Sequence, residues 1–233
     1  DRSPSRGLGD VYKRQVINMM YFSCKEGKSV NVYDFDNTIY DGESGFDIFM
    51  FYLKKDPKEI AKLIPRFGEA FIRYKRGAIK TDEVIEQYGD MLTDYCVKIK
   101  DIHKDITEFW DEHEKKIKNF YAKIQAPDDV IVSACPEIIL EEICKRIGVK
   151  NYIGSVVDME NGIIERVCYK ENKIAAFKSI YGDMPINSFY TDSMSDKPMM
   201  DLANNAYLVS GDHIELVKND GVWLSEPKTG LFK

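Results

Sequence analysis

The sequence is poor in the residues that build disulfide scaffolds or metal–thiolate sites. It has five cysteines in 233 residues, an odd number, and no two of them are spaced as C-x-x-C. A disulfide framework or a zinc site is therefore not expected, and a reducing compartment is the default. No apolar run approaches the ~18 residues that span a bilayer, and no signal-peptide pattern is present. We expect a cytoplasmic protein without a transmembrane segment.

The sequence also lacks an excess of positive charge. Its 33 Lys and Arg are outnumbered by 39 Asp and Glu, which gives a formal net charge of −6. A general nucleic-acid binder would present a basic surface, so no nucleic-acid partner is expected. Proline and glycine are scarce and 44% of the residues are hydrophobic, which excludes a disordered or fibrous chain. The length fits one domain, or one core with a sizeable insertion, and indicates no oligomeric state.

The first fifteen residues differ from the rest. Residues 2–9 are turn-rich and patternless, and residues 10–15 (Asp-Val-Tyr-Lys-Arg-Gln) resemble the translation of a transposase adapter end used in library preparation. We expect residues 1–15 to be a sequencing artefact or a disordered tail, and we exclude them from the functional argument.

Two hydrophobic patterns divide the remaining chain. Residues 30–33 form a short β-rich run that predicts a buried strand. From residue 44 to 126 apolar residues recur at helical spacing, which predicts about four helices and no strand. After Pro127 strands alternate with helices. The strands are expected at 130–133, 153–157, 188–190 and 206–209, and the helices at 136–146, 173–181 and 198–204.

This alternation predicts an α/β fold with a Rossmann-like parallel sheet covered on both faces. Residues 28–43 and 127–233 would form the core, and residues 44–126 would form an inserted helical block. Ligands bind to such sheets at the carboxyl ends of the strands.

Polar side chains stand where the predicted strands end. Asp34 and Asp36 follow the first strand, Ser133 ends the second, and Asp192 follows the strand at 188–190. Lys173 begins the helix before that last strand. We expect these side chains to meet at one edge of the sheet.

These residue types suit phosphate chemistry. A phosphate monoester is a dianion that repels a bare carboxylate, so a divalent cation and a lysine are needed to offset its charge. Asp34 and Asp192, with the backbone carbonyl of Asp36, are oxygen ligands of the kind that Mg²⁺ prefers. Lys173 and the Ser133 hydroxyl would hold phosphoryl oxygens.

Asp34 and Asp36 would then have different roles. Asp34 would attack phosphorus in line and form an aspartyl-phosphate. Asp36 points the same way in an extended segment, so it can protonate the leaving oxygen and later deprotonate the hydrolytic water. Crowded carboxylates raise one another's pKa, which favours a protonated Asp36.

The order of these groups resembles the haloacid dehalogenase superfamily, specifically its phosphoserine-phosphatase-like branch with a helical cap after the first strand. Residues 34–38 (Asp-Phe-Asp-Asn-Thr) match the first motif, D-x-D-x-T. Ser133 matches the second motif and Lys173 the third. Residues 191–196 (Thr-Asp-Ser-Met-Ser-Asp) match the fourth, D-x-x-x-D. The resemblance covers about residues 30–209, and it places the cap at residues 44–126.

The resemblance implies a magnesium-dependent phosphatase. Asp34 is the implied nucleophile and Asp36 the acid/base. The implied metal site comprises Asp34, Asp36 and Asp192. Asp196 would support the lysine or a metal-bound water.

The resemblance says less about the substrate. Thr38 of the first motif and Glu43, at the place of a substrate-contacting residue in phosphoserine phosphatases, are expected to bind substrate or phosphate. Those enzymes hold the substrate carboxylate with a cap arginine, whereas here Glu86 stands at the matched position and Arg73 and Arg76 lie nearby. Phosphoserine is therefore not the expected substrate. Small phosphorylated metabolites and phospholipid-like head groups remain.

Several alternatives stay open. Lys170 is a rival to Lys173, and the Asp192 and Asp196 carboxylates would also suit helix capping. The charged run at 112–118 is expected to be a solvated helix face. A phosphotransferase of the same family, or a phosphoacceptor signalling or binding protein without turnover, would use similar residues.

Overall fold

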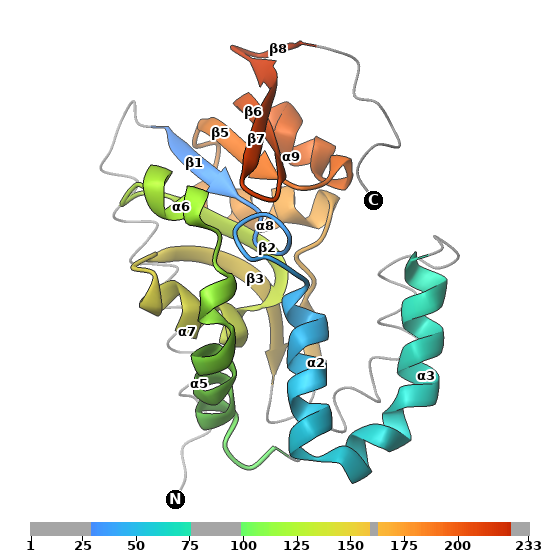
Figure 1. Ribbon diagram of the computed structural model, residues 1–233. Helices are drawn as coiled ribbons and strands as arrows, with labels where there is room; N and C mark the ends of the chain where they lie inside the picture. The colour runs from blue at the N-terminus through green and yellow to red at the C-terminus, as the bar shows by residue number, and fades with distance from the viewer. Residues whose placement is uncertain (1–28, 76–98, 159–162, 225–233) are drawn as a thin grey trace, which may run out of the picture.

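The computed structural model describes residues 29–75, 99–158 and 163–224, and in these ranges the strands form one eight-stranded sheet. The order is β4-β3-β2-β1-β5-β6-β7-β8, with β1 (Val30–Tyr33) near the centre (Figure 1). The parallel strands beside it are β2 (Val130–Pro136), β3 (Asn151–Asp158), β5 (Ile186–Thr191) and β6 (Ala203–Ser210). The predicted α/β fold with a parallel sheet is confirmed. Residues 1–15 lie outside the described ranges.

The sheet also has antiparallel strands at its edges that the sequence pattern does not predict. They are β4 (Ile163–Arg166), β7 (His213–Asn219) and β8 (Val222–Trp223). Exposed and half-buried residues alternate along β4 and the first half of β7, so these strands lack the continuous apolar run of the inner strands.

Two predicted boundaries are corrected. The second strand does not end at Ser133 but continues to Pro136. The helix expected at 198–204 is α9 (Lys197–Leu202), because Ala203 pairs with Ile186 of β5 and begins β6.

The connections place a topological switch point at β1. From β1 the chain proceeds to β2 and β3 on one side, and then crosses through α8 (Glu171–Tyr181) to β5 and β6 on the other side. Tyr33 pairs with Tyr190 in parallel register, so the segments that follow β1 and β5 leave the sheet side by side. Ligands of open α/β sheets bind at such a point.

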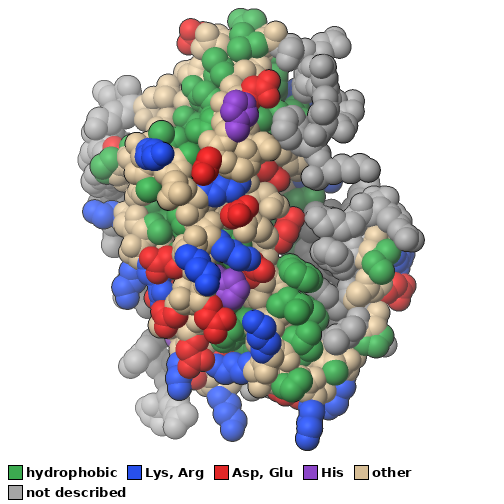
Figure 2. All heavy atoms as spheres, in the orientation of Figure 1, with side chains coloured by type: hydrophobic (Ala, Val, Ile, Leu, Met, Phe, Trp, Pro, Cys, Tyr) green, Lys and Arg blue, Asp and Glu red, His purple; other side chains and the backbone are tan. Residues whose placement is uncertain are grey.

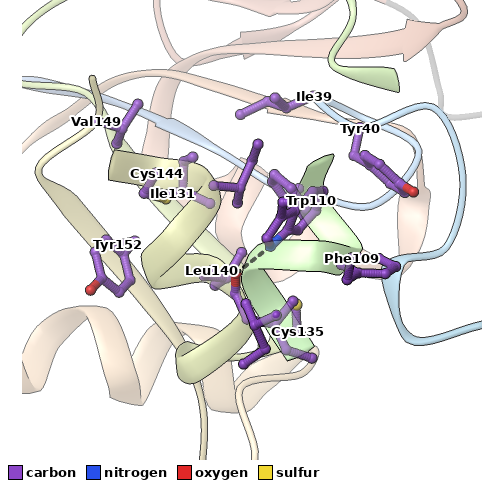
Figure 3. Packing of buried hydrophobic residues seen from close by; sticks show 14 of the residues in the cluster. Ile39, Tyr40, Phe109, Trp110, Ile131, Cys135, Leu140, Cys144, Val149 and Tyr152 are labelled. Carbon is purple, nitrogen blue, oxygen red and sulfur yellow. Dashed lines mark hydrogen bonds between the residues drawn. The ribbon is translucent and has the colours of Figure 1, made fainter. Parts of the chain in front are cut away.

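Two hydrophobic clusters cover the two faces of the sheet. Side chains alternate along β1, so Val32 joins the cluster that includes residues of α8 and α9, whereas Tyr33 joins the opposite cluster. That second cluster contains Trp110 of α5 (Ile102–His113). The Trp110 indole N–H donates to the carbonyl of Ile139 in α7 (Glu137–Arg146) at 2.9 Å (Figure 3). α5 therefore packs onto the core.

The segment between β1 and β2 is helical in its described parts. It contains α2 (Ser44–Lys55), α3 (Pro57–Lys75), α5, the 3-10 turn η1 (Glu114–Lys116) and α6 (Asn119–Ile124). Figure 1 shows α2 leading away from the sheet and α3 turning back from its far end. Figure 2 shows hydrophobic side chains gathered over α2, and acidic and basic side chains interspersed over α5.

The cap boundaries at 44 and 126 stay a prediction. α5 and α6 bury Phe109, Trp110 and Tyr121 in the same cluster as the sheet residues, so this part of the insertion belongs to the helical layer over the sheet. The helix expected around residues 84–92 lies outside the described residues. Among the helices of the described ranges, none is long and apolar enough to cross a bilayer.

Candidate active site

The loop after β1 is a tight turn held by backbone hydrogen bonds. The carbonyl oxygen of Phe35 accepts from the N–H groups of Thr38 at 3.2 Å and of Ile39 and Tyr40 at 2.9 Å. Asn37 has a φ of 57°, in the left-handed region that asparagine tolerates better than most residues. The turn therefore fixes the directions of the side chains on either side of Asn37.

Lys173 connects two buried aspartates at the switch point. Its Nζ lies 2.7 Å from Oδ1 of Asp34 and 2.7 Å from Oδ2 of Asp196, and its side chain is 3% exposed. Burial alone would lower the pKa of Lys173, but the two carboxylates raise it, so the lysine stays charged. The Thr191 hydroxyl donates to the same oxygen of Asp196 at 3.0 Å and holds that carboxylate against the lysine.

The structure distinguishes Lys173 from its sequence rival Lys170. Lys170 stands at the start of α8 with a φ of 49°, and its Nζ lies over the Tyr169 ring, 5.1 Å from the centroid. The ammonium group that contacts Asp34 is that of Lys173, one turn into the helix.

The Thr38 hydroxyl joins the loops that follow β1 and β5. Its Oγ1 accepts from the backbone N–H of Asp192 at 2.9 Å and lies 3.5 Å from Oδ2 of Asp34. Thr38 is fully buried, so its hydroxyl serves these two protein partners. A contact between Thr38 and phosphate stays a prediction, and the geometry adds a positioning role.

Asp36 is held apart from the lysine. Its Oδ1 accepts from the backbone N–H of Ser44, the first residue of α2, at 2.8 Å. Burial raises the pKa of Asp36 to about 7; the hydroxyl and the backbone N–H of Ser44 oppose this shift, and the negative charges of Asp34 and Glu43 add to it. Asp36 is therefore partly protonated near neutral pH, which suits a group that both gives and takes a proton.

Two predicted site residues have protein partners of their own. The Ser133 hydroxyl is buried and accepts from the Cys135 N–H at 3.1 Å, within the extended end of β2. Glu43 precedes α2, and its Oε1 accepts from the side-chain amide of Asn37 at 3.0 Å. Contacts of Ser133 and Glu43 with substrate stay predictions.

The acidic set is short of positive charge. Burial raises the pKa of Asp34 to about 6, a shift that Lys173 opposes and Asp196 increases. Burial likewise raises the pKa of Asp192 to about 7, and the charges of Asp34 and Asp196 increase the shift. Lys173 pairs with Asp34 and Asp196, and a divalent cation would offset the negative charge that remains.

The donor chemistry fits a hard cation. In the described ranges no group of three or more histidine, cysteine, aspartate or glutamate side chains is arranged to hold a metal ion. The predicted set does not require one, because it uses the carboxylates of Asp34 and Asp192 with the backbone carbonyl of Asp36. Carboxylate and carbonyl oxygens completed by water are the usual surroundings of Mg²⁺.

Sequence reasoning assigned no role to Ser44, Thr191 or Lys118. Thr191 lies in the fourth motif next to Asp192, and this position could have indicated that it belongs to the site. Ser44 contacts Asp36 through its backbone N–H, and its hydroxyl also lowers the pKa of that carboxyl.

Lys118 corrects a prediction. Residues 112–118 were expected to form a solvated helix face. Glu112, Glu114 and Lys115 are exposed as expected, but α5 ends at His113 and the Lys118 side chain is buried. The Lys118 ammonium donates to the backbone carbonyl of Asn37, 81 residues earlier in the chain. Helical periodicity holds no information about a contact over that separation.

The comparison with known proteins agrees with this fold. The four motifs predict a protein with a parallel α/β sheet. The structure has such a sheet, and Lys173 lies between Asp34 and Asp196 at its switch point. A family model for haloacid dehalogenase-like hydrolases matches residues 32–201, and the chain belongs to that family. None of the curated proteins compared with the chain matches it.

Two solved structures share the fold. A protein of unknown function from Bordetella pertussis Tohama I has a TM-score of 0.61 and 17% identity, over 74% of this chain and 86% of that one. A phosphoserine phosphohydrolase-like protein from Francisella tularensis subsp. tularensis SCHU S4 has a TM-score of 0.50 and 14% identity, over 77% of this chain and 86% of that one. At these identities the likeness concerns the fold alone.

Proposed function

We propose that this hydrolase is a magnesium-dependent phosphatase that cleaves a small phosphate monoester through an aspartyl-phosphate on Asp34. The observation that supports it most is the position of Lys173, whose Nζ lies 2.7 Å from both Asp34 and Asp196 in a buried site. An ion pair at this depth costs desolvation energy, and a hydrophobic pair would serve stability as well. The buried positive charge of Lys173 is better explained by a dianionic ligand.

Asp34 and Asp36 are suited to different steps. Asp34 contacts the lysine, which favours its ionised, nucleophilic form. Its oxygen forms a bond to phosphorus while the bond from phosphorus to the ester oxygen breaks, and Asp36 gives its proton to that leaving oxygen. Asp36 then takes a proton from the water that attacks the aspartyl-phosphate. Phosphate leaves, and Asp34 is regenerated.

Mg²⁺ would be held by Asp34, Asp192 and the backbone carbonyl of Asp36. When bound, it offsets the charge of the phosphoryl oxygens and of the carboxylates around them. Lys173 adds a fixed positive charge at Oδ1 of Asp34, and Asp196 and Thr191 keep that lysine in place.

The substrate is proposed only as a class. The neighbour from Francisella is described as phosphoserine phosphohydrolase-like, and a small phosphorylated metabolite would suit the same fold. Glu86 and Arg76 lie outside the described residues. Arg73 on α3 lies 3.7 Å from Glu69, in the same helix. We propose that α2 and α3, at the start of residues 44–126, act as the cap, because α2 begins at Ser44, whose N–H binds Asp36, whereas α5 and α6 pack on the sheet.

The test is turnover of p-nitrophenyl phosphate by the wild type, by Asp34→Asn and by the surface variant Asp183→Asn. Asp183 is 93% exposed and serves as the matched control. We expect Mg²⁺-dependent turnover that Asp34→Asn lowers by about 1,000-fold or more and Asp183→Asn leaves unchanged. Equal turnover by wild type and Asp34→Asn, or no effect of EDTA, would refute the mechanism.

The same assay separates the alternatives. Faster product formation with an added alcohol, together with a new phosphate ester of that alcohol, would identify a phosphotransferase. A wild-type chain that gains the mass of one phosphoryl group and keeps it without turnover would identify a phosphoacceptor protein.

A further inference from the structure

A short segment after α5 is paired with the loop that follows the nucleophile. The Asp41 N–H donates to the carbonyl of Lys116 at 2.8 Å, and the Lys118 N–H donates to the carbonyl of Ile39 at 2.8 Å. Between these bonds Tyr40 and Ile117 form an antiparallel bridge. The late part of the insertion is thus fixed to the first motif.

The Lys118 side chain extends this pairing into the site. It is 8% exposed, and its ammonium donates to the backbone carbonyl of Asn37. Burying an ammonium is costly unless it is hydrogen-bonded and near negative charge. Burial lowers the pKa of the Lys118 ammonium, and the negative charges of Asp41, Asp192 and Asp212 oppose that shift. A neutral side chain would fill the same space without that cost.

The peptide that Lys118 holds lies between two site residues. Asn37 follows Asp36, whose carboxylate accepts from the Ser44 N–H. It precedes Thr38, whose hydroxyl accepts from the Asp192 N–H. Asn37 is also the residue in the left-handed conformation, which most side chains avoid. A rotation of this peptide would turn Asp36 and Thr38 together.

We propose that Lys118 is a positioning residue: its ammonium holds the Asn37 peptide so that Asp36 is directed at the leaving oxygen. The inference rests on the proposed function for its kinetic part. Its structural part, the fixing of residues 36–42, stands on the contacts alone.

Leaving-group dependence tests the kinetic part. An ester whose leaving group is weakly basic, such as p-nitrophenyl phosphate, departs without a proton, whereas an alkyl phosphate needs one from Asp36. In Lys118→Met we expect kcat/KM to fall about tenfold further for the alkyl ester than for the p-nitrophenyl ester. A lower folded fraction, or a weaker attraction for the dianion, would reduce both alike.

The matched control is Lys115→Met, the same substitution at an exposed lysine of the same segment. It should leave both esters unaffected. Equal loss for the two esters in Lys118→Met overturns the proposal, and so does a selective loss that Lys115→Met reproduces.

Amide hydrogen exchange measures the structural part without turnover. Peptides that cover residues 36–42 should exchange faster in Lys118→Met than in the wild type or Lys115→Met, because Thr38, Ile39 and Tyr40 lose the support of their turn. Unchanged exchange overturns the proposal. If the wild type hydrolyses no ester, the proposed function fails, and exchange alone then decides whether Lys118 fixes the loop.

Discussion

Thr38 Oγ1 accepts a hydrogen bond from the backbone N–H of Asp192 at 2.9 Å, so a single hydroxyl links the first and fourth motifs across 154 residues of sequence. Thr38→Val keeps the shape of the side chain and removes the acceptor. We expect a loss of about 1–3 kcal/mol in the free energy of unfolding, because the Asp192 N–H is left without this partner. Urea unfolding measures the loss.

Thr38→Ser is the control for that substitution, because it keeps the hydroxyl. The kcat/KM for an aryl phosphate should fall more in Thr38→Val than in Thr38→Ser. If the two variants unfold and react alike, the hydroxyl is not what joins the loops.

The pairing of Lys173 with two aspartates predicts strong coupling. Lys173→Met leaves Asp34 and Asp196 buried without their cation, which costs about 3–5 kcal/mol. When Asp196→Asn is added to Lys173→Met, one of the two uncompensated charges is removed. The double variant should therefore be more stable than the sum of the single losses predicts, by about 1–3 kcal/mol.

The exposed ion pair of Lys197 and Asp201 is the matched comparison. Their side chains are 45% and 47% exposed, and their nearest atoms are 2.7 Å apart, the same distance as in the buried pair. The coupling energy from the equivalent double-mutant cycle, with Lys197→Met and Asp201→Asn, should be below about 1 kcal/mol. Similar coupling in both cycles would show that burial does not strengthen the Lys173 contacts.

Mg²⁺ should stabilise the folded chain even without substrate. A ligand that binds the folded state alone, at a hundred times its Kd, adds about 2.7 kcal/mol to the free energy of unfolding. Thermal unfolding with MgCl₂, compared with EDTA, should show this shift in the wild type and in Asp183→Asn. Asp192→Asn should lose it, and an undiminished shift in that variant would exclude Asp192 as a ligand.

The fold and the acidic set follow from local patterns in the sequence. The buried strands at 30–33 and 188–190 are apolar runs, and the aspartates that follow them must meet because parallel strands end at one edge. Lys173 was identified by the order of the motifs and by its place at the start of a helix. The strands and helices depend on residues close together in sequence, which the periodicity of apolar residues indicates, whereas Lys173 was predicted from the order of motifs along the chain.

The parts that escaped prediction depend on tertiary contacts. The edge strand β4 alternates exposed and half-buried residues and has no apolar run. Lys118 lies in a charged run that would suit a solvated helix, and only the packing of α5 and α6 on the sheet brings it to Asn37. The backbone N–H groups that donate to the hydroxyls of Thr38 and Ser133 were not predicted either, whereas the contacts of these hydroxyls with phosphate stay predictions.

The close approach of β2 and β3 predicts that Gly154 tolerates no side chain. A Cβ at Gly154 would lie 2.4 Å from the carbonyl oxygen of Cys135, a backbone atom that cannot turn aside. Gly154→Ala should therefore separate the strands beside Ser133 and cost about 1–3 kcal/mol in urea unfolding.

Gly68 of α3 is the opposite case, because a Cβ there would meet no atom within 4 Å in the described part of the chain beyond its own helix backbone and its chain neighbours. Gly68→Ala should stabilise the chain by about 0.5–1 kcal/mol, since alanine loses less backbone entropy in a helix. The contrast in sign is the decisive result. A neutral Gly154→Ala would mean that β2 and β3 separate at little cost.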